Sequence, residues 1–277
     1  MADVRLRTVD SFTDKPFRGN PAAVVMLDQA PSDDWMAAVA RETNLSESGF
    51  VIREKLPEAD FRLRWFTRGA VEVDLCGHAT LAAAHCLLED GVGSPIRFAT
   101  RSGLLTVNKR EDGSLAMDFP AWPPAAIEPP AGIADALGMA VEWTGRSDNN
   151  YLLALVADER VVRKLSPDIA GIARLPADVV IVTAAADPEQ PHEFVSRVFA
   201  PNVGIEEDPV TGSAHTILGP YWADRLGRTS LVGLQASARS GLVGVEVRDD
   251  RVVVSGRAVT ILDGVLRSTD DASSVSA

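Results

Sequence analysis

One short sequence motif occurs twice in the chain. Residues 74–84 read DLCGHATLAAA, and residues 209–219 read PVTGSAHTILG. When Gly77 is aligned with Gly212, both copies place small residues around the glycine and an apolar stretch after it. A repeat this far apart in one chain predicts two pseudo-equivalent halves, each with one helix that starts at its glycine.

Each copy opens a run of thirteen residues, 76–88 and 211–223, that contains no Asp, Glu, Lys or Arg. A helix without a polar face has to be enclosed by other elements rather than laid on a surface. Segments rich in β-branched residues surround both runs and predict strands. They are residues 4–12, 21–27, 48–53, 61–66 and 103–108 in the first half, and 150–156, 178–184, 193–199, 242–248 and 251–262 in the second. The expected fold class is α+β, with two pseudo-symmetric domains, each a barrel-like, mostly antiparallel sheet wrapped around a central buried helix.

Residues 119–132, FPAWPPAAIEPPAG, hold five prolines. Proline removes a backbone donor and fixes φ, so neither a helix nor a central strand is expected to run through this segment. We therefore predict domains at residues 1–118 and 133–277, joined by a linker at 119–132. The last strand of the chain could return to the first domain.

Two local features refine the helix predictions. Residues 32–44 predict an amphipathic helix with Ser32 as its N-cap and two aspartates in its first turn, where the helix dipole favours them. Pro220 lies inside the second apolar run and deletes one helical hydrogen bond. We expect that helix to be kinked there, or to have a looser first segment.

The composition of the chain limits which partners and which cellular location are expected. The 277 residues carry 27 basic and 39 acidic side chains, a net charge of −12, and no Lys/Arg cluster longer than a dipeptide. Nucleic acid and anionic membranes are therefore poor partners. The first residues lack the apolar core of a signal peptide, and no apolar run reaches the length that spans a bilayer. A cytoplasmic protein is expected, and the two cysteines, Cys76 and Cys86, lie too far apart on one helix to form a disulfide.

The two helix starts are candidate anion sites. The first backbone N–H groups of a helix lack partners and the dipole adds positive charge, so a carboxylate can bind there. Gly77 and Gly212 would let the ligand approach the backbone closely. The alternative is that these glycines only allow tight packing; the repetition of the phrase favours binding.

Several polar residues near the helix starts are candidates for chemistry. His78 lies in a first turn, where the dipole keeps its ring neutral, although it could equally be a structural histidine. Asp208 precedes Pro209 and lies at the mouth of the second helix, where it could be a simple cap. Glu206 and Glu207 adjoin it, and one of the three acids could carry a proton.

Three more residues have no decisive pattern of their own. Glu47 stands in NLSESGF between small neighbours that would admit a ligand, but a solvated glutamate is the simpler interpretation. We interpret His85 as a core residue. His215 could support a site or only the fold.

Taken together, five long segments resemble the phenazine biosynthesis PhzF-like isomerase family. The resemblance extends from about Val4 to Leu266, and its most specific blocks are CGHAT and EDPVTGSAH, in that order. The segments are VDSFTDKPFRGNPAAVV, ETNLSESGFV, EVDLCGHATLAAA, FAPNVGIEEDPVTGSAHTILGPYWADRLG and LQASARSGLVGVEVRDDRVVVSGRAVTILDGVL.

The resemblance implies a diaminopimelate-epimerase-like fold with its site between two domains, no cofactor and a homodimer. The residues that match the family's catalytic positions are Glu47 as the acid/base group, with His78, Asp208 and Ser213. The residues that would hold the substrate are Gly77, Gly212, Cys76 and Thr211. The sequence departs from the family's usual wording at Arg68, which could clamp a substrate carboxylate or point to solvent, and at Thr216.

Two other chemistries fit less well. Racemases that share this fold place a cysteine at both helix starts, whereas Cys76 is matched here by Thr211, whose hydroxyl is far too weak an acid to be the second base. A metal site built from Cys76, His78, His85 and Cys86 is disfavoured, because these residues spread around and along one helix. We therefore expect no metal.

The leading hypothesis is a cofactor-independent isomerase that moves a proton, and with it a double bond, on a small carboxylated metabolite. The alternative is a noncatalytic family member that binds a carboxylate or regulates a partner. A racemase or epimerase, and a cysteine hydrolase based on Cys76, are weaker candidates. The sequence does not name the substrate.

Overall fold

The computed structural model describes residues 3–54 and 56–267. The chain divides into two compact units, one formed by the residues up to 117 together with those from 256 onward, and the other by residues 118–255. The proline-rich segment therefore lies with the second unit, and the last strand lies with the first. The prediction that neither a helix nor a central strand runs through residues 119–132 is confirmed: one strand ends at Pro120, and a two-residue strand at the end of its series forms at Ala125–Ala126.

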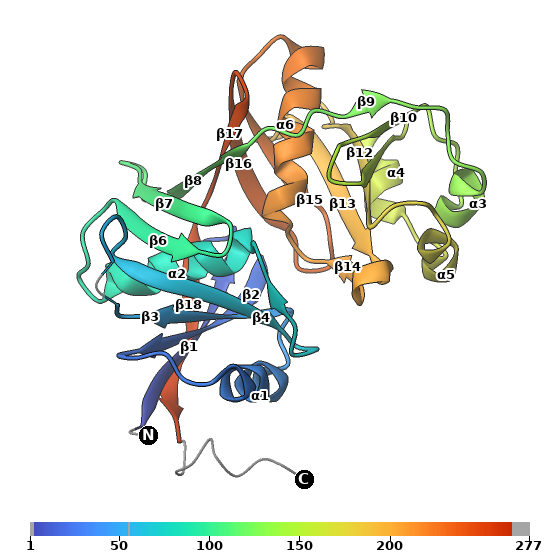
Figure 1. The fold of residues 1–277 in the computed structure, drawn as a ribbon. Coiled ribbons are helices and arrows are strands. Elements are labelled where there is room, and N and C mark those ends of the chain that lie inside the picture. Colours follow the sequence, from blue (N-terminus) through green and yellow to red (C-terminus); the bar gives the residue numbers. More distant parts are fainter. Residues whose placement is uncertain (1–2, 55, 268–277) are drawn as a thin grey trace. The chain divides into compact units, whose positions relative to one another are not determined.

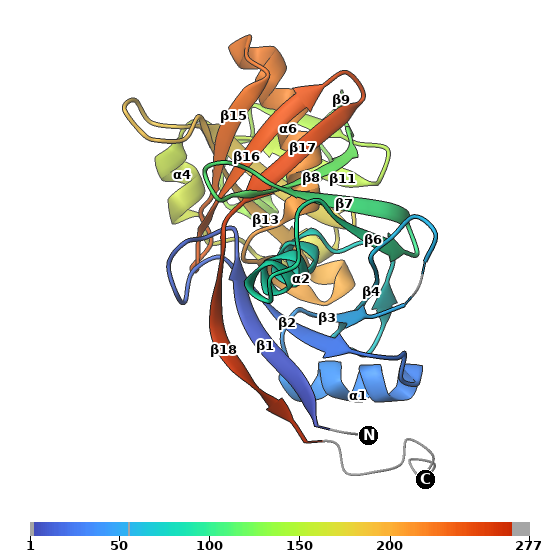
Figure 2. The ribbon, with the colours of Figure 1, turned by 90° about the vertical axis from the view of Figure 1, so that its left-hand side faces the viewer.

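The first unit is a sheet wrapped around one helix. Its strands are β1 (Val4–Ser11), β2 (Asn20–Leu27), β3 (Glu47–Ile52), β4 (Phe61–Thr67), β5 (Glu72–Val73), β6 (Ile96–Thr100), β7 (Gly103–Lys109), the first part of β8 (Leu115–Pro120) and β18 (Ala258–Leu266); its helices are α1 (Asp33–Thr43) and α2 (Gly77–Glu89). Figure 2 looks nearly along α2 and shows these strands around it. Nine of its thirteen residues are buried, as its uncharged sequence requires.

Helix α1 covers the outer face of this sheet. Its buried residues pack with apolar side chains of β2 and β3, including Val25 and Phe50. The predicted cap is confirmed: the Ser32 hydroxyl accepts a hydrogen bond from the N–H of Trp35 at 3.3 Å. At the other end, Asn44 adopts the left-handed conformation that ends a helix.

The second unit repeats this design. Its strands are β9 (Ala125–Ala126), β10 (Trp143–Arg146), β11 (Tyr151–Leu155), β12 (Val179–Ala185), β13 (Phe194–Ala200), β14 (Ile205–Asp208), β15 (Ser230–Gln235), β16 (Gly241–Arg248) and β17 (Arg251–Gly256); its helices are α3 (Ile133–Leu137), α4 (Glu159–Lys164), α5 (Ile169–Ala173), the 3-10 turn η1 (Pro201–Val203) and α6 (Gly212–Leu226). Figure 1 shows α6 lying against β15 and β16.

Strand pairing follows one scheme in both units. In the first, the neighbours run β18, β1, β2, β3, β4, β6, β7, β8, and in the second β9, β10, β11, β12, β13, β15, β16, β17. The third and fourth strands of each series are parallel, as are the fifth and sixth, and the other neighbouring pairs along both series are antiparallel. The α+β fold class predicted from the sequence is confirmed.

Helix α6 is continuous from Gly212 to Leu226 although Pro220 lies inside it. The expectation of a looser first segment is therefore wrong. The free state of Cys76 and Cys86 agrees with the spacing argument. Among the described residues, no helix combines the length and the hydropathy that crossing a bilayer requires.

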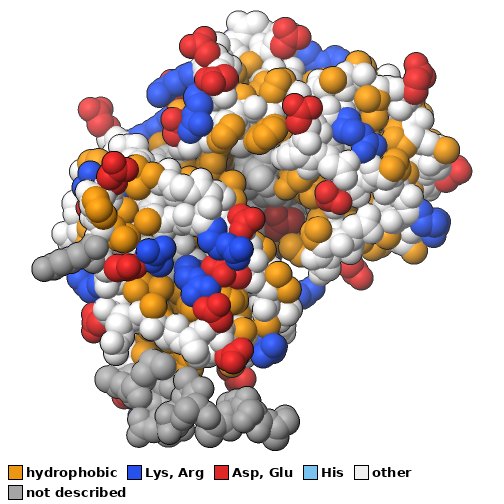
Figure 3. Space-filling view, in the orientation of Figure 1, with side chains coloured by type: hydrophobic (Ala, Val, Ile, Leu, Met, Phe, Trp, Pro, Cys, Tyr) orange, Lys and Arg blue, Asp and Glu red, His pale blue; other side chains and the backbone are white. Residues whose placement is uncertain are grey.

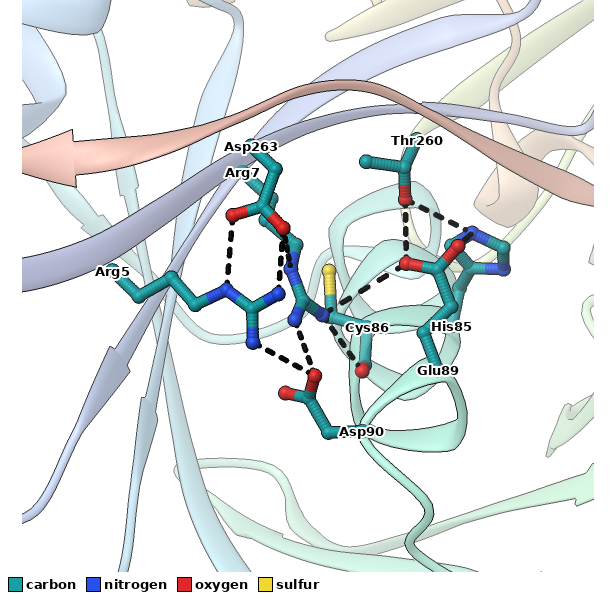
Figure 4. A network of polar contacts seen from close by, with 8 residues as sticks. All are labelled: Arg5, Arg7, His85, Cys86, Glu89, Asp90, Thr260 and Asp263. Atoms are coloured by element: carbon teal, nitrogen blue, oxygen red, sulfur yellow. Dashed lines mark hydrogen bonds and ion pairs between the residues drawn. The ribbon is translucent and has the colours of Figure 1, made fainter.

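A buried arginine fastens the last strand to the first unit. Arg7 on β1 donates to the carbonyl of Cys86 at 2.8 Å, forms an ion pair with Asp90, and lies 3.4 Å from the carboxylate of Asp263 on β18 (Figure 4). His85 lies nearby but not in the apolar core that the sequence predicted for it. Its Nε2 atom is 3.3 Å from Glu89 and 3.2 Å from Thr260.

Charged side chains of both signs are interleaved on the face shown in Figure 3. The pairs are specific; for example, Arg64 contacts both carboxylate oxygens of Glu72 at 2.7 Å and Asp33 at 2.7 Å. In such pairs the acidic partner compensates the basic charge locally.

Candidate functional site

The long helices α2 and α6 begin in the same way. Cys76 and Thr211 are their N-cap residues, both in extended conformation, and in neither does a side chain cap the helix or an acid occupy the first turn. The shorter α4, by contrast, is capped by Asp158. At neither helix start does the side chain of the N-cap residue accept a hydrogen bond from the first turn, as N-cap side chains commonly do.

Glu47, Cys76 and His78 come together in the first unit. Glu47 is the first residue of β3, and Cys76 is the N-cap residue of α2. The distances between their side chains and His78 show that the strand start and the helix start lie side by side. The Nε2 atom of His78 is 3.5 Å from a Glu47 carboxylate oxygen and 3.4 Å from the Ser46 hydroxyl. Its Nδ1 atom is 3.5 Å from the Cys76 sulfur.

Glu47, Cys76 and His78 form one compact cluster. The Nδ1 atom of His78 is paired with the Cys76 thiol and its Nε2 atom with the Glu47 carboxylate. One ligand-type atom from each residue lies within 4.8 Å of the other two. Groups at these distances can pass a proton between neighbours, and their atom types are also those that bind metal ions.

Within this cluster, the surroundings of Glu47 shift the pKa of its carboxyl. Glu47 is only 9% exposed to solvent. Burial raises the pKa of the Glu47 carboxyl, against a hydrogen bond from Ser46 and the charge of Arg68, which both lower it. A carboxyl whose pKa moves toward neutrality can take up and return a proton at physiological pH.

Arg68 is exposed, and its backbone N–H donates to the carbonyl of Ser46 at 3.2 Å. Its charge nevertheless reaches Glu47, since it contributes to the lowering of that carboxyl's pKa. The sequence left open whether Arg68 points to solvent or toward a ligand. It lies near enough to the acid/base candidate to influence an anion bound there.

Asp208, Thr211 and Gln235 form the corresponding cluster in the second unit. The hydroxyl of Thr211 donates to the carboxylate of Asp208 at 2.5 Å. The side chain of Gln235 accepts from the N–H of Thr211 at 2.8 Å and donates to the carbonyl of Asp208 at 2.8 Å. Three hydrogen bonds therefore fix the segment immediately before α6.

Ser213 and Tyr151 form a second polar contact at this helix start. Their hydroxyl oxygens are 3.3 Å apart. Burial raises the pKa of Tyr151, the hydrogen bond with Ser213 lowers it, and the charge of Asp208 raises it again. The phenol stays protonated at neutral pH, so it can donate to Ser213 or to a bound anion.

The remaining candidates of the second unit have structural roles. His215 is fully buried; its Nδ1 atom donates to the carbonyl of Thr211 at 2.8 Å, and burial lowers the pKa of its ring to about 4. It supports the helix start as a neutral ring. Glu207 forms a two-pronged ion pair with Arg197 at 2.7 and 2.8 Å, so it is not the proton carrier that the acidic run suggested. Glu206 is exposed.

The sequence analysis missed Gln235, Tyr151 and a pair of serines. Ser102 donates to the carbonyl of Asp74 at 2.6 Å, and Ser237 donates to the carbonyl of Pro209 at 2.7 Å, so each serine holds the turn before one helix. The sequence held only a partial signal for this pair. The phrase RSGL occurs at residues 101–104 and again at 239–242, but its serines are Ser102 and Ser240, and Ser237 lies two residues before the second copy.

Known proteins resemble this chain over nearly its whole length. A family model described as phenazine biosynthesis-like protein (PhzC-PhzF) matches residues 9–264. The chain belongs to this PhzF-like family. An uncharacterized isomerase of Pseudomonas aeruginosa is 50% identical over 260 residues, which is 93% of this chain and 96% of the relative. A second uncharacterized isomerase, from Halalkalibacterium halodurans, is 41% identical over 267 residues, covering 95% and 98%.

A solved PhzF-family structure from Enterococcus faecalis has the same fold. It superposes with a TM-score of 0.90 at 37% sequence identity and covers 96% of this chain and 100% of that one. Membership in the PhzF-like family, together with relatives named as isomerases, identifies the protein as an isomerase. The resemblance inferred from the motifs is confirmed.

Proposed function

We propose that this PhzF-like isomerase works without a cofactor and moves a proton, with its double bond, on a small carboxylated metabolite. The observation that carries the proposal is Glu47, a buried carboxyl of raised pKa at 3.5 Å from His78 and next to an uncapped helix start. This combination supports the proposal, because a carboxyl of raised pKa can carry a proton and the backbone N–H groups of a helix start can bind an anion.

In the proposed reaction, the carboxylate of Glu47 removes a proton from a carbon of the substrate. The electron pair left by that C–H bond forms a new double bond, and the old double bond takes the proton back at its far end. Atoms and charge balance without any other reactant. Backbone N–H groups of the first turns at Gly77 and Gly212 would bind the substrate carboxylate and the negative charge that develops in the transition state.

The other residues orient the substrate. His78 would share a proton with Glu47, and Asp208 and Ser213 would hydrogen-bond the substrate from the second unit. Cys76 and Thr211 would contact it at the helix starts. The cluster at each helix start supplies groups that this reaction needs.

Replacing Glu47 by Gln tests the proposal. Glu47→Gln keeps size and hydrogen bonding but removes the proton carrier, so we expect turnover to fall by about 10² or more. The assay incubates the protein with a panel of small carboxylated metabolites in deuterated water and reads deuterium uptake by mass spectrometry. Glu42→Gln, at an exposed glutamate of α1, is the matched control and should leave uptake unchanged.

Glu47→Gln is expected to lower turnover without lowering stability. Because the folded pKa of Glu47 is raised, its contribution to stability is present at pH below the ordinary value and is lost as pH rises through the folded pKa. Glu47→Gln should therefore leave the melting temperature at neutral pH unchanged or higher. A variant that melts lower, or one that keeps near-wild-type deuterium uptake, contradicts the assignment.

The same experiment decides the noncatalytic alternative. A carboxylate-binding family member would bind compounds of the panel, as seen by calorimetry, without incorporating deuterium into any of them. A racemase would incorporate deuterium with inversion at one carbon and with the double bonds unmoved. Such a reaction needs a base on each face, and Thr211 is not one.

A further inference from the structure

Gln235 occupies an unusual position for a polar side chain. It is the last residue of β15, its exposure is 0%, and its amide faces the four-residue segment that leads into α6. Its side-chain hydrogen bonds go to Asp208 and Thr211. A buried amide with every contact on two candidate site residues has a role in holding that site.

The directions of these hydrogen bonds are fixed by chemistry. The amide oxygen accepts from the N–H of Thr211, and the amide nitrogen donates to the carbonyl of Asp208. Exchanging the oxygen and the nitrogen would bring two donors together at Thr211 and two acceptors together at Asp208, so only one orientation is possible.

This orientation decides where the Thr211 proton goes. The amide nitrogen of Gln235 also donates to the Thr211 hydroxyl oxygen at 3.1 Å. That oxygen already accepts a hydrogen bond from Gln235, so its own proton points elsewhere, and the carboxylate of Asp208 lies at 2.5 Å. The hydroxyl is thereby a donor to Asp208 and not an acceptor from it.

We propose that Gln235 is a positioning residue that acts through Thr211 to keep Asp208 an ionised hydrogen-bond acceptor at the start of α6. Its importance for turnover rests on the proposed function, but its effect on Asp208 does not. Asp208 would then enter the reaction as an acceptor for a substrate hydroxyl or amine, while Glu47 carries the proton.

The test follows the Asp208 carboxyl directly by a ¹³C NMR pH titration of its side-chain carbon, assigned with Asp208→Asn. Removing the hydroxyl in Thr211→Val should raise the titration midpoint by about one pH unit, because the ionised form loses a hydrogen bond. Gln235→Met should raise it by a similar amount. The double substitution should add little to either, because Gln235 acts through the hydroxyl.

Ser237→Ala is the matched control. The Ser237 hydroxyl holds the same turn by donating to the carbonyl of Pro209 at 2.7 Å, and not to the Asp208 side chain. Its loss should leave the Asp208 midpoint within about 0.2 units, whereas a general loosening of the turn would move it as far as Gln235→Met does. Should Gln235→Met fail to fold, Gln235→Leu replaces it, since its side chain also cannot donate to Thr211 and adds no charge beside Asp208.

Two results overturn the proposal: a midpoint unmoved by the Gln235 substitution while Thr211→Val moves it, or fully additive shifts in the double variant. Deuterium uptake is then measured on the same variants. Shifted midpoints in a protein that exchanges no substrate proton would support the role of Gln235 and contradict the proposed isomerisation, so the two failures are distinguishable.

Discussion

Substitution of Arg7 tests how the last strand, β18, is held to the rest of the first unit. Its side chain is 1% exposed and contacts the end of α2 at Cys86 and Asp90, as well as Asp263 on β18. Arg5, two residues away on β1, pairs with the same two aspartates but is 46% exposed. The two arginines therefore contact the same two aspartates but differ in how deeply they are buried.

The expected cost follows from burial. Removing one member of a fully buried ion pair costs about 3–5 kcal/mol, but Asp90 and Asp263 are 24% and 44% exposed and can be hydrated when Arg7 is gone. The Cys86 carbonyl also keeps the N–H of Asp90 at 3.1 Å. We expect Arg7→Met to cost about 2–3 kcal/mol, and Arg5→Met at most about 1 kcal/mol, as for an exposed pair.

Amide hydrogen exchange, read by mass spectrometry on peptides from β18, measures this cost locally. A loss of about 2–3 kcal/mol corresponds to exchange that is about 30- to 150-fold faster in residues 258–266, since 1.4 kcal/mol is a factor of ten. Peptides from the second unit serve as internal controls. If Arg7→Met accelerates exchange no more than Arg5→Met does, the buried guanidinium is not what anchors β18, and the reasoning is wrong.

Two further predictions concern α1 and α4. Ser32→Ala should lower the free energy of unfolding by about 0.5 kcal/mol, the low end for an N-cap because its hydrogen bond is 3.3 Å long, and Ser32→Asp should restore it; urea midpoints decide. Burial alone would raise the pKa of Glu159, but hydrogen bonds from Asp187 and Arg163 and the charge of His192 lower it below 4.5. Its contribution is therefore present above pH 4.5 and lost as pH falls through the folded pKa, so the stability gap between wild type and Glu159→Gln should narrow with acid; a gap independent of pH contradicts this.

The sequence predicted the elements whose physical cause is local. The uncharged runs identified α2 and α6 to within a few residues, because no surface can stabilise a helix that is apolar all round. Ser32 marked the start of α1 because a cap acts within one turn.

The elements that were missed depend on distant partners. Helices α3 and α5 have five residues each, too few to show a helical period. Strand β6 at Ile96–Thr100 includes a charged residue and is held by pairing with β4 and β7. Residues 251–262 were predicted as one strand because β-branched residues occur in both halves of the stretch. The structure divides it: β17 ends at Gly256, and β18 begins at Ala258 in the other unit.

The same distinction applies to the site. Helix starts at Gly77 and Gly212 could be predicted because the turn and the helix are adjacent in the chain. Glu47 stood out only through the family resemblance, since its burial is a property of the fold. Gln235 had no signal at all, because it reaches Thr211 from a different strand, and its meaning lies in the direction of three hydrogen bonds.

The two halves share a scaffold but not a chemistry, and this difference bears on the type of reaction. At the first helix start, a thiol, an imidazole and a buried carboxyl lie in one cluster. At the second, the equivalent of the thiol is a hydroxyl that already donates to Asp208. A reaction that inverts a carbon needs a proton carrier on each face of that carbon, whereas moving a proton along one face of a substrate needs only one. The asymmetry between Cys76 and Thr211 therefore agrees with the proposal that Glu47 is the single base.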